Sequence, residues 1–353
     1  MKIALAQLNY IIGDFQFNIQ KLIDSIQEAK KQKADLIVFA ELAVCGYPPL
    51  DFLEFDDFID LCNQAVEKIA KECTGIAAII GAPTFNPDEK GKRLFNSAYF
   101  LKDGKVESVH HKGLLPNYGI FDEYRYFESA QHFQLVNYQG QKLAITICED
   151  LWKMENGRAY QRAPMDELAK EKPDLLINIA ASPFSYKQED ERSKMLQENA
   201  SKHGIPVVYV NHVGAQTEII FDGGSRVINA NSSAVASCGF FNEAICYYDT
   251  EWQTQEVEMT AMGKMEKIHK ALILGLRDYF RKLNFQKATL GLSGGLDSSL
   301  VLALAVEALG KENVFPILMP SQFSSGHSIS DSEQLCRNLG CDYTTIPIKN
   351  IFD

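Results

Sequence analysis

The chain has 353 residues, of which 46% are hydrophobic and 23% charged, which is the composition of a soluble globular enzyme. It is too long to fold around a single ordinary hydrophobic core, so we expect two domains. Its net charge of -11 argues against DNA or RNA as a partner, because proteins that dock on phosphate backbones concentrate positive charge. The chain opens on an apparent strand rather than a signal peptide, and no apolar run could span a bilayer. We therefore expect a cytoplasmic protein with no membrane partner.

Short β-branched runs alternate with amphipathic stretches from residue 2 to residue 213, which is the layout of an α/β fold. Strands are expected at 2–8, 34–41, 76–84, 96–102, 105–111, 142–148, 174–182 and 206–213, and helices at 18–32 and 190–203. From Gly214 to Tyr248, Gly and Asn residues indicate hairpins that close a sheet edge.

A second unit begins after a polar, irregular stretch. Residues 253–262 are expected to form a linker. Beyond it the pattern predicts a helix at 266–285, a strand at 287–292, a Gly-rich turn, a helix from Asp297 to Leu309, and strands at 314–319 and 341–348. The sequence therefore predicts domains at 1–252 and 263–353.

The eight cysteines are scattered, with no C-x-x-C pair, at positions 45, 62, 73, 148, 238, 246, 336 and 341. This pattern disfavours both a zinc site and a disulfide framework, so reduced thiols are expected.

Cys148 ends the apolar run 143–148 and is followed by Glu149, Asp150 and Trp152. A thiol after a strand is more often a small core hydrophobe than a nucleophile. However, the chain turns here from a buried ladder to polar and aromatic residues, and strand ends in α/β folds are where sites are built. A nucleophilic thiol also needs a base, because the thiolate is the reactive form.

The sequence offers two kinds of base for this thiol, a carboxylate and a histidine, and one cation that could stabilise the thiolate. Glu41 closes the apolar run 34–41, where a carboxylate is costly to bury without a purpose, although such a residue taken by itself is more often a solvated strand end. Lys112 follows the strand at 105–111, and its ammonium could stabilise a thiolate or an oxyanion. His110 and His111 are rival bases, and the residues alone leave a Cys-His dyad open.

The segments FAELAVCGYPP, HKGLLPNYGIFDEYRYF and ITICEDLW resemble the three signature segments of the nitrilase (carbon-nitrogen hydrolase) superfamily, in the family order. The resemblance implies an α-β-β-α sandwich with Glu41 as general base, Lys112 as oxyanion stabiliser and Cys148 as the nucleophile that forms a thioester. It also implies that Glu123 orients Lys112 or Glu41, and that the backbone N–H of Glu149 shares the oxyanion.

The segment LPNYGIFDE is similar to the corresponding segment of the glutaminase subgroup of that family. This similarity implies that glutamine contacts Tyr118 and Ser182, and that Glu149 and Trp152 line its pocket. A basic residue follows the serine in the family; Lys187 is the nearest match here, although its spacing differs.

A second candidate site is the loop LGLSGGLDSS, which fits neither a Walker A motif nor G-x-G-x-x-G. Its glycines allow backbone N–H groups to approach an anion, and a helix N-terminus follows. Asp297 beside phosphates would require a cation, which indicates Mg²⁺; alternatively Asp297 is only a helix cap in an ordinary turn. The residues assigned to ATP are Gly291, Leu292, Ser293, Gly294, Gly295, Leu296, Asp297 and Ser298.

SGGLDSS resembles the signature of the ATP pyrophosphatase (PP-loop) superfamily, and the wider segment through MPSQFSS resembles the synthetase domain of the glutamine-dependent NAD⁺ synthetase family. The resemblance implies the start of a Rossmann-like parallel α/β domain. It further implies the substrates L-glutamine, ATP with Mg²⁺ and deamido-NAD (nicotinic acid adenine dinucleotide), no tightly bound organic cofactor, and a homo-oligomer.

The family's synthetase domain extends further than residue 353, so we expect either part of a longer protein or a lost second activity. Two other hypotheses stay open. One is a stand-alone amidase with a vestigial PP-loop segment, and the other is a non-catalytic subunit, against which the retained Glu41, Lys112 and Cys148 argue.

Overall fold

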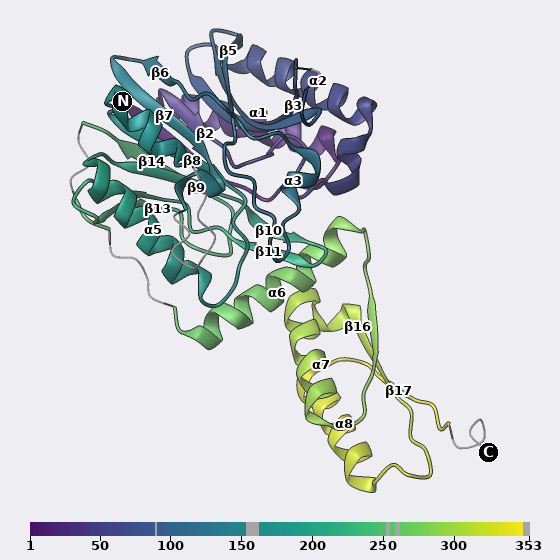
Figure 1. The fold of residues 1–353 in the computed structure, drawn as a ribbon. Helices are drawn as coiled ribbons and strands as arrows, with labels where there is room; N and C mark the ends of the chain where they lie inside the picture. The colour runs from purple at the N-terminus through teal and green to yellow at the C-terminus, as the bar shows by residue number, and fades with distance from the viewer. Residues whose placement is uncertain (89, 153–161, 252–254, 258–261, 349–353) are drawn as a thin grey trace. The chain divides into compact units, whose positions relative to one another are not determined.

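The computed structural model describes residues 1–88, 90–152, 162–251, 255–257 and 262–348 (Figure 1). They fall into two compact units, Met1–Met262 and Gly263–Asp353, which are considered separately below. Most of the linker predicted at 253–262 lies outside the described residues.

Two six-stranded sheets form the framework of the first unit. One has the strand order β14-β1-β2-β3-β4-β5 and the other β13-β12-β9-β8-β7-β6. The strands of the first sheet are β1 (Lys2–Gln7), β2 (Leu36–Val38), β3 (Ala77–Phe85), β4 (Leu94–Lys102), β5 (Lys105–His111) and β14 (Ala244–Asp249). Those of the second are β6 (Leu135–Tyr138), β7 (Gln141–Ile147), β8 (Leu175–Ala180), β9 (Val207–Asn211), β12 (Arg226–Ile228) and β13 (Ala234–Ser237). A hairpin of β10 (Val213–Gln216) and β11 (Ile219–Asp222) stands apart from both sheets.

Helices complete the layers. They are α1 (Phe15–Lys31), α2 (Asp56–Glu72), α3 (Glu123–Tyr126), α4 (Pro164–Leu168) and α5 (Gln188–His203). The Asp14 side chain accepts a hydrogen bond from Phe17 N and so caps α1, while Lys30 and Lys31 in the last turn complement the helix dipole.

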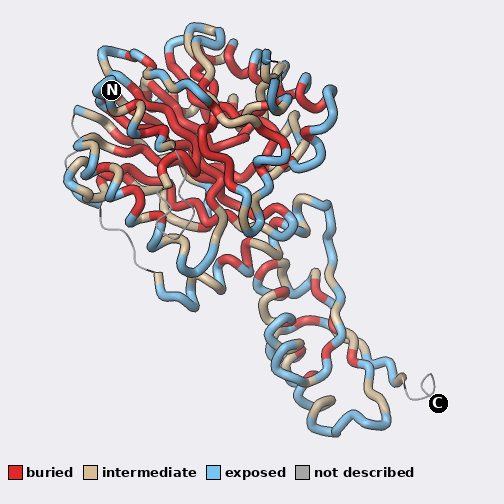
Figure 2. The backbone as a smooth tube through the Cα atoms, viewed as in Figure 1, coloured by how far each residue is buried: buried red, intermediate tan, exposed pale blue. Residues whose placement is uncertain are grey.

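The core has two main apolar layers, seen as the buried segments at the centre of the first unit in Figure 2. One cluster joins both sheets and α5, for example Leu5, Ile145 and Leu196. The other joins the opposite face of the first sheet to α1 and α2, for example Ile37 and Ile69. This is the predicted α-β-β-α sandwich, and the parallel pairs β1-β2, β7-β8 and β8-β9 bring several strand ends together at its edge.

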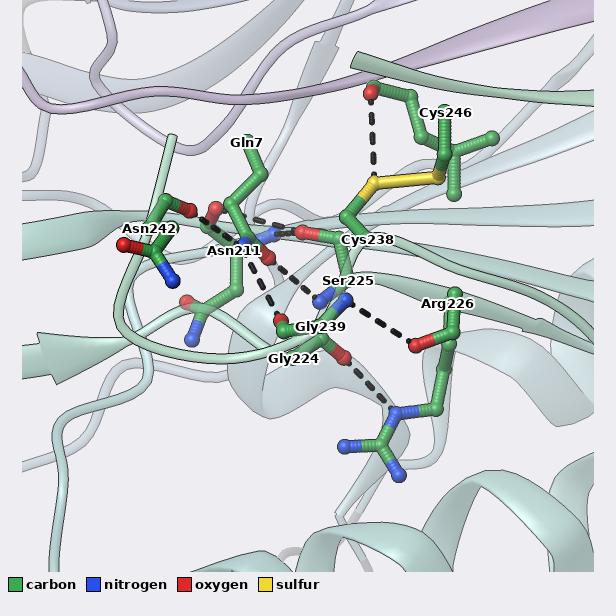
Figure 3. Close-up of a disulfide and its surroundings, with 11 residues drawn as sticks. Gln7, Asn211, Gly224, Ser225, Arg226, Cys238, Gly239, Asn242 and Cys246 are labelled. Carbon is green, nitrogen blue, oxygen red and sulfur yellow. Dashed lines mark hydrogen bonds between the residues drawn. A yellow bond between two sulfur atoms is a disulfide. The ribbon is translucent and has the colours of Figure 1, made fainter. Parts of the chain in front are cut away.

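The expectation that every thiol is reduced is wrong at one pair. Cys238, just after β13, and Cys246, in β14, form a disulfide with a Cα–Cα distance of 5.4 Å (Figure 3). Because β13 and β14 belong to different sheets, the bond joins the two layers of the sandwich. The other six cysteines are free and buried.

The second unit has a three-stranded parallel sheet in the order β15-β16-β17. Its elements are α6 (Lys264–Lys282), β15 (Ala288–Gly291), α7 (Leu296–Leu309), β16 (Val314–Leu318), α8 (Gly326–Leu339) and β17 (Thr344–Thr345). The alternation of parallel strands and helices agrees with the predicted start of a Rossmann-like domain. Within the described part of the chain, no helix is both long and apolar enough to cross a membrane.

Candidate active site

Three of the predicted residues follow strand ends in the first unit. Glu41 lies just beyond β2, Lys112 directly follows β5, and Cys148 directly follows β7. Glu41 and Lys112 are completely buried, and Cys148 is 5% exposed. Two charged residues this deep in a protein require partners, since an isolated buried charge is strongly destabilising.

Lys112 lies between two carboxylates. Its Nζ donates hydrogen bonds to Oε1 of Glu41 at 2.7 Å and to Oε1 of Glu123 at 2.8 Å. Asn96 Nδ2 also donates to Glu41 Oε1 at 2.7 Å, and the Tyr47 hydroxyl donates to Glu123 Oε1 at 2.8 Å. The lysine is thus held by two carboxylates, each of which is fixed in turn by a further hydrogen bond, so its ammonium is oriented.

The other oxygen of Glu41 has a different partner. Oε2 accepts a hydrogen bond from Ala181 N at 2.9 Å, just beyond β8. The base candidate is thus connected to both sheets, through Asn96 and Lys112 on one side and through the strand β8 on the other.

Cys148 begins a 3₁₀ turn, Cys148–Leu151, at the end of β7. Its φ of 45° lies in the left-handed region, which is uncommon for a residue with a side chain and is concentrated at functional sites. Asn178 Nδ2 donates to the Cys148 carbonyl at 3.4 Å. The sharp change of direction takes the thiol out of the ladder of β7.

Asp150 holds this turn and was not among the predicted site residues. Its Oδ2 accepts from Ile147 N at 2.9 Å, and its Oδ1 accepts from Gly113 N and Leu114 N, both at 2.9 Å. One buried carboxylate therefore ties the turn of the nucleophile to the segment that follows Lys112. The signal available in the sequence was a second acidic residue immediately beyond the end of an apolar strand.

The electrostatics favour a protonated thiol at rest. Burial raises the pKa of Cys148 well above its usual range, the charge of Glu41 raises it further, and the Lys112 ammonium opposes both. Burial alone would lower the pKa of Lys112, but the carboxylates of Glu123 and Glu41 outweigh it and the pKa is raised, so the ammonium stays charged. Burial raises the pKa of Glu123, although the Lys112 ammonium acts to lower it. A thiol in this setting needs a neighbouring base to react.

Cys148 opens on a cavity of about 400 Å³. Four of the predicted substrate residues line it: Tyr118, Glu149, Trp152 and Ser182. The Tyr118 hydroxyl lies 3.0 Å from Oε1 and 3.1 Å from Oε2 of Glu149, and Glu149 is almost fully buried. The structure thus brings the nucleophile and this predicted pocket together.

Lys187 does not belong to that lining. It precedes α5, is exposed, and its Nζ lies 5.7 Å from the centre of the Tyr186 ring. The helix register places Gln188, Glu191 and Lys194 on the cavity instead, together with Lys202.

The rival histidines lie elsewhere. His111 Nδ1 is 2.7 Å from the Ser97 hydroxyl, and the imidazole stacks on Phe95. His110 Nε2 is 2.9 Å from the Ser108 hydroxyl. Both line a separate cavity with His132 and not the one at Cys148, whereas Glu41 is among the charges that act on the Cys148 thiol.

The predicted ATP loop connects β15 to α7. Leu292 is buried and its N–H donates to Ile317 O, whereas Ser293, Gly295 and Asp297 are exposed. The Ser298 hydroxyl lies 3.0 Å from that of Ser293. Gly294 has a φ of 79°, and an added Cβ would lie 2.4 Å from the Ser328 carbonyl oxygen, so only glycine fits there. Asp297 stands in the first turn of α7.

Among the described residues, no group of three His, Cys, Asp or Glu side chains could hold a metal ion by itself.

Comparisons with known proteins identify two families along the chain. Residues 2–257 match the carbon-nitrogen hydrolase family. The chain belongs to that family. Residues 268–353 match the NAD synthase family.

Relatives span both regions. A glutamine-dependent NAD(+) synthetase of Synechocystis is 41% identical over 98% of this chain, and one of Thermotoga maritima is 34% identical over all of it. The matches cover 64% and 66% of those relatives, so this chain spans about two thirds of their length.

Two solved structures have folds similar to that of this chain. The glutamine-dependent NAD+ synthetase from Acinetobacter baumannii, in complex with ADP, has a TM-score of 0.91 and 35% identity, covering 99% of this chain and 65% of that one. A mutant of the amidase from Nesterenkonia sp. AN1 has a TM-score of 0.60 at 22% identity, covering 72% of this chain and 94% of that one, which supports the sandwich fold alone.

Proposed function

We propose that this chain carries the glutaminase and the first part of the synthetase of a glutamine-dependent NAD⁺ synthetase. The observation that carries the proposal is the buried Glu41–Lys112–Glu123 cluster, which interacts electrostatically with Cys148 on a substrate-sized cavity. We assign the glutaminase to residues 1–252, a linker to 253–262 and the synthetase part to 263–353.

In the first half-reaction, Glu41 takes the proton of the Cys148 thiol as the sulfur attacks the carboxamide carbon of L-glutamine. The oxyanion of the tetrahedral intermediate is stabilised by the Lys112 ammonium and the backbone N–H of Glu149. The C–N bond then breaks, the nitrogen leaves as ammonia with the proton from Glu41, and a thioester remains. Water, deprotonated by Glu41, attacks the thioester and releases glutamate and the free thiol.

Glutamine would lie in the cavity with its carboxamide at Cys148. Tyr118, Glu149, Trp152 and Ser182 are positioned to contact it. Lys187 has less support because it is exposed and outside the lining, and a basic contact to the substrate would come more readily from Lys194 or Lys202.

In the second half-reaction, ATP adenylates the carboxylate of deamido-NAD with release of pyrophosphate, and ammonia then displaces AMP to give NAD⁺. The loop from Gly291 to Ser298 would bind the ATP phosphates, since its exposed serines and glycines precede the N-terminus of α7. The A. baumannii relative was solved in complex with ADP, which supports an adenine nucleotide as a ligand. Mg²⁺ suits the site because Asp297 offers a hard carboxylate ligand beside phosphate oxygens. A homo-oligomer and a cytoplasmic location remain predictions.

The test is ammonia release from L-glutamine by this chain, with ATP, Mg²⁺ and deamido-NAD present and NAD⁺ assayed in parallel. Cys148→Ala should abolish ammonia release. Cys73→Ala removes another buried thiol, which lies outside the Cys148 cavity at the end of α2, and should retain it.

Cys148-dependent ammonia would establish the glutaminase, and NAD⁺ formation would establish synthesis by this chain. Ammonia without NAD⁺ would support the amidase half alone. Ammonia release that survives in Cys148→Ala, or none from the wild-type chain, would contradict the proposal.

A further inference from the structure

A fully buried amide lies behind the cavity wall. Asn211 ends β9, and its side chain clamps both backbone groups of one residue of the neighbouring strand end: Oδ1 accepts from Ser182 N at 2.8 Å and Nδ2 donates to Ser182 O at 3.0 Å. The parallel ladder of β8 and β9 ends with Ala180 opposite Asn211. The amide therefore takes the place of the next peptide unit and extends the pairing beyond the strand.

The clamped segment touches two parts of the site. Ser182 lines the cavity with Cys148, and the preceding residue, Ala181, donates its N–H to Oε2 of Glu41 at 2.9 Å. Glu41 Oε1 is already bound to Lys112 and Asn96. The Ala181 N–H is thus the contact that fixes the second oxygen of the base.

Asn211 is itself held from behind. Its N–H donates to the Ser225 hydroxyl at 3.0 Å, Ser225 N donates to Oε1 of Gln7 at 2.8 Å, and Gln7 is completely buried. Gln7 Nε2 donates to the carbonyls of Gly239 and Asn242, in the loop that the Cys238–Cys246 disulfide closes (Figure 3). The network leaves Asn211 little freedom to move.

We propose that Asn211 is a positioning residue of the thiol site: it holds Ala181 and Ser182 so that the Ala181 N–H orients Glu41 towards its role as base for Cys148. The role rests on the proposed function only in that Glu41 activates this thiol; it does not depend on which amide is cleaved.

The readout is therefore the rate at which iodoacetamide alkylates Cys148, followed by peptide mass spectrometry, because this reaction requires thiol deprotonation but no substrate. In Asn211→Ala the rate should fall about tenfold or more, since a positioned base contributes on the order of 10² or more to proton transfer. Ammonia release should show a fall in kcat of similar size.

Asn18 provides a matched control. It is also completely buried, its amide clamps both backbone groups of Ile11 and donates to Val44 O, and none of these hydrogen bonds involves Glu41, Lys112, Cys148 or Ser182. Asn18→Ala should lose comparable stability in urea unfolding while the alkylation rate stays within about twofold of wild type. Equal slowing in both variants would reduce Asn211 to a structural residue and overturn the proposal.

A milder variant decides the matter if Asn211→Ala does not fold. Ser225→Ala leaves the Asn211 amide in place and removes the hydroxyl that accepts from the Asn211 backbone N–H and lies 3.5 Å from its carbonyl oxygen, so alkylation should slow about threefold. An unchanged rate in folded Ser225→Ala and Asn211→Asp would overturn the proposal. Slowed alkylation in a chain that releases no ammonia from glutamine would keep this role and reject the glutaminase.

Discussion

Replacing Glu123 by glutamine tests whether the second carboxylate orients the lysine. The side chain keeps its size and an oxygen acceptor, but Lys112 keeps only one anionic partner, Glu41 at 2.7 Å. An ammonium has three N–H groups, and two are used by Glu41 and Glu123, which leaves one for an oxyanion. Losing the charge of Glu123 loosens that arrangement.

The size of the effect follows from the burial of the cluster. Removing one partner of a buried ion pair costs about 3–5 kcal/mol, but here Glu41 still pairs with Lys112 and the neutral amide is cheaper to bury. We therefore expect the free energy of unfolding to fall by about 2 kcal/mol. A positioned oxyanion donor is worth on the order of 10²–10³ in kcat, so a misaligned one should lower kcat by about 10². KM should change less than about threefold, because Glu123 does not line the cavity and so provides little ground-state binding.

Steady-state ammonia release and urea unfolding measure the two effects separately. Glu67→Gln removes the same charge from an exposed position on α2 and should change neither. A folded Glu123→Gln with kcat within threefold of wild type would refute the orienting role. A raised KM at unchanged kcat would show instead that Glu123 acts on substrate binding.

Three further changes test other parts of the molecule. Burial, aided by His111, lowers the pKa of His110 from 6.5 to about 4, so the stability that the neutral imidazole provides is lost as pH falls below about 6.5. The free energy of unfolding of His110→Gln should therefore fall by about 2 kcal/mol less than that of wild type between pH 7.5 and 5, and an equal fall in both proteins, measured by urea unfolding, would contradict this. The disulfide closes a separation of 8 residues, so Cys246→Ser should lower the free energy of unfolding by about 2–3 kcal/mol and abolish its dependence on dithiothreitol. In Gly294→Ala the new Cβ would collide with the Ser328 backbone, so calorimetry should show ATP binding weakened tenfold or more while ammonia release stays unchanged; wild-type ATP affinity would make the loop an ordinary turn.

The sequence predicted the residues that stand at strand ends, because alternation and length locate strands without tertiary information. Their strand-end positions singled out Glu41 and Cys148, the resemblance to the nitrilase superfamily implied their roles, and those roles stay predictions. The fold class is confirmed. Helix α2 was missed although Phe58, Ile59, Cys62 and Ile69 recur at helical spacing and are buried.

Residues that act across strands were not predictable. Asn96, Tyr47 and Asn211 acquire their roles from pairing between distant segments, and nothing in their local sequence signals it. Cys238 and Cys246 meet because the end of β13 in one sheet lies against β14 of the other, which is a tertiary arrangement that the sequence does not signal. Lys187 illustrates a different limit of sequence reasoning. A motif match suggests which type of residue contacts a substrate, but the residue at which α5 begins decides which side chains reach the cavity.

The contacts of Glu41 also decide which of its oxygens can take the thiol proton in the proposed mechanism. A carboxylate oxygen has two lone-pair sites. Among the residues that the structure describes, Oε1 receives two donors, from Lys112 and Asn96, while Oε2 receives one, from Ala181. Oε1 is therefore saturated, and Oε2 keeps a site for the proton that leaves the Cys148 thiol and then passes to the departing nitrogen. Because Ala181 alone orients that oxygen, an error in the segment that Asn211 holds would misdirect the acceptor and leave Lys112 in place.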